Sequence, residues 1–230
     1  MKIVLTPDWF LGSDVLIEVF SFIILFIFFF LSIRNYKISK NKGLLYLGIG
    51  FLLIAIAEIA TILTKLVLFY DTSFTQSIGK MIVTYQFVNS VDIFYSIGFF
   101  IHKFFTLLGF YIIYRIPLNK KISGDILIIL YFIIISVIFS QGFYYLFHLT
   151  ALVFLVLIAN NYNDIYKKNK SYNTKILVIA FSILALSQVI FILSKIEVLY
   201  AIAQFIQLAS YIILLVLIIR ILKHGKKKKP

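Results

Sequence analysis

Three ionisable residues stand inside apolar stretches of this sequence, where a charge is costly. Glu58 lies near the middle of one stretch, and His102 and Lys103 lie near the middle of the next. Counted along a helix at about 1.5 Å per residue, all three fall at a similar depth. A carboxylate beside a histidine could exchange protons during transport. A pair of Glu58 with Lys103 or His102 could instead be a fixed structural link, and both interpretations stay open.

Other polar residues recur at steps of three or four, so that each set lies on one helical face. Two such faces are predicted, one with Tyr95, Gly98, His102, Thr106 and Gly109, the other with Tyr200, Gln204, Gln207 and Tyr211. We expect the two glycines to serve close helix packing. The candidates for a ligand or proton pathway are Glu58, His102, Lys103, Glu18, His148, Gln188, Gln204, Gln207 and Tyr95.

Simpler roles suit several other residues. Lys65 and Lys195 lie toward helix ends, so we expect them to extend to the interface as anchors. The run Phe26 to Phe30 is expected to face lipid, and Glu197 is expected to be solvated.

No catalytic or cofactor-binding pattern is visible. The sequence has no cysteine, and its three histidines have no metal-binding spacing. It has no Ser-His-Asp set and no glycine-rich phosphate loop. We therefore expect no enzyme activity, no catalytic residue, no metal and no cofactor.

The composition requires a membrane to position these side chains. Of 230 residues, 62% are hydrophobic and 13% are charged, against about 45–50% and 25% in soluble domains. This excludes a soluble domain, a disordered chain and a nucleic-acid partner. A transmembrane helix needs about 20 apolar residues. The sequence predicts an all-α membrane protein with seven transmembrane helices, near 13–33, 44–70, 91–117, 124–140, 142–161, 174–195 and 198–222.

The basic residues predict the orientation. Of the 22 Lys and Arg residues, 17 lie in or directly beside the loops after the first, third and fifth helices and the tail. Short basic loops stay cytoplasmic, which places the N-terminus outside and the C-terminus inside. The basic tail, residues 223–230, is expected to contact anionic lipid head groups in the cell membrane.

The chain also resembles itself. Residues 18–70 match residues 148–200 at an offset of 130, with 12 identities that include Tyr36-Lys37 and Tyr166-Lys167. The third and seventh helices match at an offset of 105. We predict a single domain over 1–230 with a 3+1+3 parallel repeat: three helices in 13–117, a connector in 124–140 and three helices in 142–222.

The repeat gives the candidate residues a common geometry. Glu58 corresponds to Gln188, Glu18 to His148, and His102 to Gln207. An axis along the membrane normal would turn these positions toward one cavity, at the midplane or in the outer half.

In its plan of helices the chain resembles microbial rhodopsins, and also SWEET and PQ-loop transporters. The resemblance to rhodopsins implies a seven-helix bundle with an extracellular hairpin, for which residues 71–90 are the candidate. The retinal lysine of the last helix is missing, because no lysine lies between Val198 and Ile219, and Trp9 is the single tryptophan. The proline-glutamine signature of the transporters is also missing.

Two functions fit this pattern best, ahead of a retinal protein built on Lys103 and a lipid-directed enzyme or scaffold. The first is a small-solute transporter, which is proton-coupled if Glu58 exchanges protons. The alternative is a rhodopsin-like sensor or receptor without retinal, acting through a separate membrane partner. The expected partners are the lipid bilayer and an unknown small ligand, with a membrane partner or a second copy of the chain left open.

Overall fold

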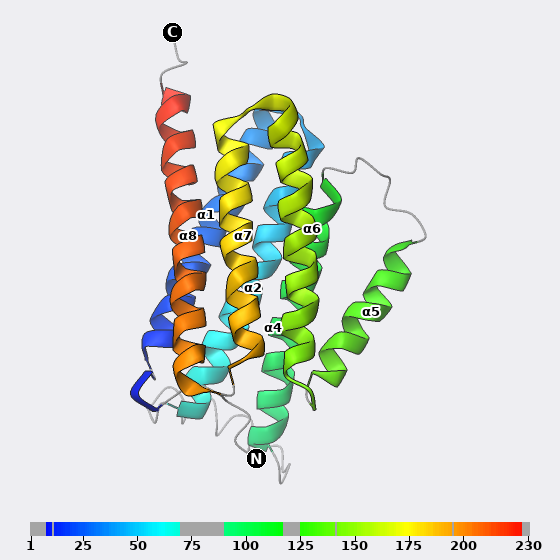
Figure 1. Ribbon diagram of the computed structural model, residues 1–230, viewed down its shortest axis with the longest axis vertical. Helices are drawn as coiled ribbons and strands as arrows, with labels where there is room; N and C mark the ends of the chain where they lie inside the picture. Colours follow the sequence, from blue (N-terminus) through cyan, green and yellow to red (C-terminus); the bar gives the residue numbers. More distant parts are fainter. Residues whose placement is uncertain are drawn as a thin grey trace.

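The computed structural model describes residues 8–10, 12–69, 90–116, 125–140, 142–194 and 196–226. This part of the chain is helical throughout, as expected (Figure 1). A short 3-10 helix, η1 (Asp8–Phe10), precedes seven α-helices. They are α1 (Ser13–Ser39), α2 (Lys42–Phe69), α4 (Ser90–Arg115), α5 (Asp125–Phe139), α6 (Tyr145–Asn169), α7 (Tyr172–Ile192) and α8 (Glu197–Lys226).

Six of these helices are long and apolar enough to cross a membrane, which makes the chain a multi-pass membrane protein. The exception is α5, which has 15 residues. At 1.5 Å per residue it extends about 22 Å, less than the roughly 30 Å of the hydrocarbon core. The structure thus supports six of the seven expected spans.

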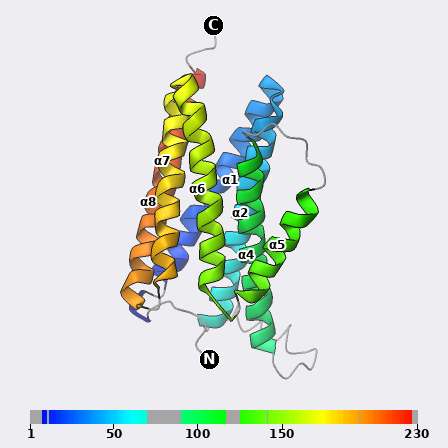
Figure 2. The same ribbon diagram turned by 45° about the vertical axis from the view of Figure 1, so that its right-hand side comes forward.

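The six long helices form a closed ring in the order α1, α2, α4, α6, α7, α8, with α8 packed back against α1. The short helix α5 lies outside the ring, against α4 and α6 (Figure 2). The first and last helices of the ring run so that α1 begins and α8 ends at opposite ends of the bundle (Figure 1).

The outer surface of the ring is apolar, as lipid contact requires. Leu16 is 71% exposed and Phe30 is 56% exposed. The expectation that the whole run Phe26 to Phe30 faces lipid is wrong for Phe28, which is 4% exposed and stacks on Phe51 at 4.7 Å between ring centroids. The helical period explains this, because Phe28 shares a face with the buried Ile24.

Two tight connections in the ring have the same geometry. After α1, Lys40 adopts a left-handed conformation (φ 56°), and its N–H donates to the Tyr36 carbonyl oxygen at 2.8 Å. After α6, Lys170 does the same (φ 50°), donating to the Tyr166 carbonyl oxygen at 2.7 Å. Glycine is the usual residue at such a helix end, because a Cβ makes this conformation costly.

We therefore expect Lys40→Gly and Lys170→Gly each to stabilise the fold by about 0.5–1 kcal/mol, by relieving this backbone strain. Thermal unfolding of the purified protein in detergent is the measurement. Lys168→Gly is the matched control, because Lys168 lies inside α6, where glycine should lower stability by about 1 kcal/mol. A lower melting temperature for Lys170→Gly would contradict the assigned turn.

Glycines let α2 and α4 approach closely. A Cβ on Gly109 would lie 2.6 Å from Ile54 Cγ1 and 2.8 Å from the Gly50 carbonyl oxygen. A Cβ on Gly98 would collide with the Thr64 side chain. The packing role expected for Gly98 and Gly109 is confirmed, and this seam holds Glu58 of α2 beside His102 of α4.

Gly109→Ala should force α2 and α4 apart and destabilise the protein by about 1–3 kcal/mol. The readout is the melting temperature in detergent. Gly142→Ala serves as the control, because a Cβ there meets nothing closer than a carbonyl oxygen at 3.9 Å. Equal melting temperatures for the two variants would refute the close contact.

Candidate functional site

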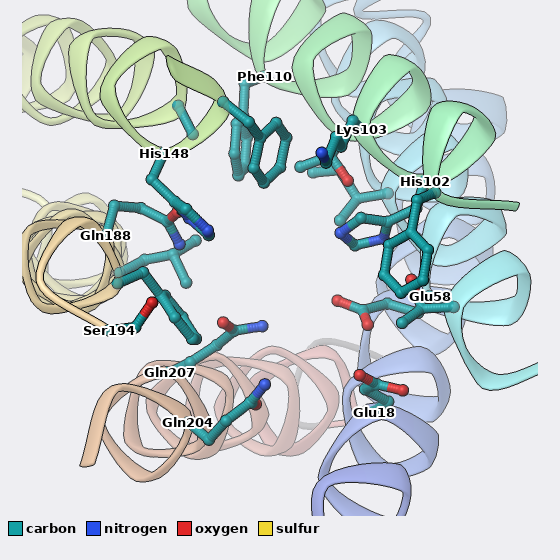
Figure 3. Close-up of a pocket in the computed structure, with 18 of the residues that line it drawn as sticks. Glu18, Glu58, His102, Lys103, Phe110, His148, Gln188, Ser194, Gln204 and Gln207 are labelled. Atoms are coloured by element: carbon teal, nitrogen blue, oxygen red, sulfur yellow. The ribbon is translucent and has the colours of Figure 1, made fainter. Parts of the chain in front are cut away.

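A cavity of about 160 Å³ lies inside the ring and is lined by all six of its helices. Eight of the nine residues proposed from the sequence line it: Glu18, Glu58, His102, Lys103, His148, Gln188, Gln204 and Gln207 (Figure 3). The ninth, Tyr95, belongs to α4, but its side chain lies outside the described residues. The structure thus brings together residues from distant parts of the chain, while their role stays a prediction.

The cavity occupies the half of the ring nearer the start of α1. Glu18 lies five residues into that helix, or about 8 Å along it. The other half is filled by a hydrophobic core that includes Leu25, Phe51, Leu155 and Phe181. A polar chamber therefore faces one end of the bundle, and packed apolar side chains close the other end.

Lys65 is the largest departure from expectation. It does not extend to the interface but is 3% exposed, and its ammonium lies 2.6 Å from Asp14 Oδ2 and 2.5 Å from Glu18 Oε1. The hydroxyl of Tyr200 accepts a third hydrogen bond from it at 3.3 Å. The sequence predicts that Lys65 extends outward, because a long side chain near a helix end can reach the membrane interface. Two carboxylates within reach lower the free-energy cost of burying its charge instead.

Glu58 is 3% exposed and faces the cavity from α2 (Figure 3). The Tyr211 hydroxyl donates to its Oε1 at 3.3 Å, and the Gln207 amide donates to that hydroxyl at 3.4 Å. Within the described part of the chain, no Lys, Arg or His side chain forms an ion pair with Glu58. A buried carboxylate without a cation can take up a proton or a cationic ligand.

The expected pairing of Glu58 with Lys103 or His102 is therefore not observed. His102 Nδ1 donates to the Ala57 carbonyl oxygen at 3.1 Å. Lys103 donates instead to Ser140 Oγ at 2.9 Å, beside the end of α5. Adjacent helical residues point about 100° apart, so His102 can face α2 only if Lys103 turns toward α5 and α6.

The opposite wall of the cavity is neutral. His148 Nδ1 donates to Gln188 Oε1 at 2.8 Å, and the His148 ring stacks on Phe191. Gln204 Nε2 donates to the Tyr200 hydroxyl at 3.1 Å. This wall, formed by α6, α7 and α8, can hydrogen-bond a ligand but carries no carboxylate among its described lining residues.

Four polar atoms of the lining have no partner in the described structure, although their residues are over nine-tenths buried. They are Glu18 Oε2, Thr106 Oγ1, Ser194 Oγ and Gln204 Oε1. An unsatisfied buried polar atom costs about 1–3 kcal/mol. Their gathering around one chamber indicates that water or a polar ligand completes the site.

Sequence reasoning missed several members of this site. The sequence pattern does not single out Asp14, and it predicts Lys65 as an anchor at the interface. A signal was available: Asp14 and Glu18 are four residues apart and share one helical face, at a depth that Lys65 of the next helix matches. Ser194 gave no such signal, because it follows the last turn of α7.

No protein-family model matches the chain, and neither the comparison with curated proteins nor that with solved structures gives a match. Fold and geometry define the class: a helical multi-pass membrane protein with a polar chamber enclosed by six spans.

The ion cluster around Lys65 gives a sharp prediction. Lys65→Met removes the buried ammonium that Asp14 and Glu18 share and should cost about 3–5 kcal/mol. Adding Asp14→Asn and Glu18→Gln to Lys65→Met should recover most of the lost thermal stability. Lys103→Met is the control, with a smaller loss expected because its ammonium has no carboxylate partner in the described structure. A triple variant no more stable than the single one would refute the cluster.

Proposed function

We propose that this protein is a small-solute transporter of the cell membrane that binds its solute in the chamber and exchanges protons at Glu58. The observation that carries the proposal is the buried Glu58 carboxylate, held by a hydroxyl at 3.3 Å and facing a chamber of about 160 Å³. Unpaired polar atoms around it give a solute hydrogen-bonding positions. No enzyme activity is proposed.

The proposed orientation has the N-terminus outside and the C-terminus in the cytoplasm, as the basic loops predict. In that orientation the chamber lies in the outer half of the membrane. The apolar core then closes the path to the cytoplasm, so the structure corresponds to an outward-facing or occluded state. Transport would require α1, α2 and α4 to move relative to α6, α7 and α8.

The parallel repeat remains part of this proposal, and three structural matches support it. Phe51 and Phe181, at equivalent positions, are both 1% exposed. The turns at Lys40 and Lys170 have the same geometry. Glu58 and its equivalent Gln188 line the same chamber from opposite sides. Two similar halves around a central site are the common plan of secondary transporters.

A sensor is the second candidate, and one observation favours it. The described helices contain no proline, so no proline breaks a described span. Broken helices often form transporter sites. A sensor would bind the same ligand in the chamber without moving it and would signal through a membrane partner.

The test is a current measurement on a solid-supported membrane carrying the reconstituted protein. Pooled amines, amino acids, sugars and organic acids are applied with a pH step. We expect a solute-dependent current that is lost in Glu58→Gln, because the amide cannot exchange a proton. Glu197→Gln is the matched control, since Glu197 is exposed at the start of α8 and should leave the current unchanged.

Absence of any current from folded wild-type protein would favour the sensor. A current that Glu58→Gln leaves intact would remove Glu58 from the proton pathway.

A further inference from the structure

The chamber has acidic groups on one side and neutral groups on the other (Figure 3). Glu18, Glu58, His102 and Lys103 come from α1, α2 and α4, whereas His148, Gln188 and Ser194 come from α6, α7 and the turn that follows it. Gln204 and Gln207 of α8, the third helix of the neutral wall, lie at the edge of that wall nearer the acidic groups.

Among the described residues of the acidic wall, one carboxylate has no cation beside it. Glu18 pairs with the ammonium of Lys65, whereas Glu58 has no ion-pair partner in the described part of the chain. Lys103 also borders the chamber, but its ammonium donates to Ser140. An ionised Glu58 is therefore the group whose charge one monovalent cation would balance.

The unpaired atoms of the lining include acceptors that a ligand with hydrogen-bond donors would satisfy. Glu18 Oε2 and Gln204 Oε1 can only accept. Both histidines donate through Nδ1, to Ala57 and to Gln188, which leaves the second ring nitrogen of each as an acceptor. Thr106 and Ser194 add two hydroxyls that can serve either way. A primary ammonium carries three N–H donors and a positive charge, so it can both hydrogen-bond the unpaired acceptors and pair with Glu58.

The volume of the chamber and its aromatic lining limit the size of the ligand and favour a cationic one. A cavity of about 150 Å³ holds a molecule the size of benzene, and this chamber is about 160 Å³. Rings of Phe99, Phe110, Phe147 and Tyr211 border it, and aromatic faces attract cations. The neutral wall suits a hydroxyl or amide at the ligand's other end.

We propose that the chamber binds a small primary amine with a neutral hydrogen-bonding group, its ammonium on the Glu18 and Glu58 side and its polar end toward Gln188 and Ser194. This assignment rests on the proposed function in that it names the class of solute for the same chamber. It concerns binding and can be tested without transport.

The test is isothermal calorimetry on the full-length protein in detergent, with thermal unfolding as a second readout. The probes are ethanolamine, choline, ethylene glycol and glycolate, at matched ionic strength. We expect saturable binding of ethanolamine, at least tenfold tighter than that of choline, which has no N–H donor, or of uncharged ethylene glycol. Glycolate should not bind, because it carries a carboxylate toward the acidic wall.

Two variants locate the ammonium. Glu58→Gln and Gln204→Leu should each weaken ethanolamine binding at least tenfold, because each removes an acceptor for a charged donor. Glu197→Gln should bind as wild type does. Monodispersity and the melting temperature without ligand establish that each variant is folded.

No binding of ethanolamine to folded wild-type protein would overturn the proposal, as would equal or tighter binding of choline, ethylene glycol or glycolate. Ethanolamine binding without uptake of labelled ethanolamine into proteoliposomes would uphold the ligand class and defeat the transporter, since exchange of one ammonium for one proton carries no net current. A transport current for another solute, with no amine binding, would uphold the transporter and defeat the proposed ligand class.

Discussion

The ammonium of Lys65 holds two carboxylates of α1 against α2, and the polar half of the bundle depends on this contact. Each of these charges alone would be costly in a low-dielectric interior, and together they are tolerated because one oxygen of each carboxylate lies within hydrogen-bond distance of the ammonium. The Tyr200 hydroxyl joins α8 to the same ammonium and also accepts from Gln204. The contact that joins α1 to α8 and closes the ring therefore also fixes part of the chamber's lining.

The distribution of polar groups along the ring follows from the same cost. Carboxylates, histidines and amides gather in one half, while the other half is packed with Leu, Ile and Phe. Polar groups that share a chamber can satisfy one another through chains such as Gln207, Tyr211 and Glu58. Scattered singly along six helices, each would need its own partner, so concentration in one chamber is the less costly arrangement.

Most of the fold could be predicted from the sequence, because length and hydropathy determine where a membrane helix can lie. The predicted helices agree with the observed ones to within a few residues at most ends, and α5 matches its predicted range to within one residue at each end but is too short to count among the spans. Helical periodicity and depth can both be counted from the sequence, and they were enough to select eight side chains that share one chamber.

The hydrogen-bond and ion-pair partners of these side chains could not be predicted, since they depend on the rotation of each helix about its axis. Glu58 and Lys103 match in depth, but Lys103 points toward Ser140. Lys65 also lies at the same depth as Asp14 and Glu18, but the rotation of α1 about its axis determines that these three side chains form an ion cluster.

The two walls differ in charge for an electrostatic reason. If Gln188 and His148 were carboxylates like their proposed equivalents Glu58 and Glu18, four acids would share about 160 Å³. Two like charges about 4 Å apart repel by about 4 kcal/mol at the effective dielectric of a protein, so such a chamber would hold several protons in place of a ligand. Neutral groups on one side remove that repulsion and leave Glu58 free to interact with whatever enters. The chamber thereby has a direction, and the amine proposed as its ligand would bind in it in a single orientation.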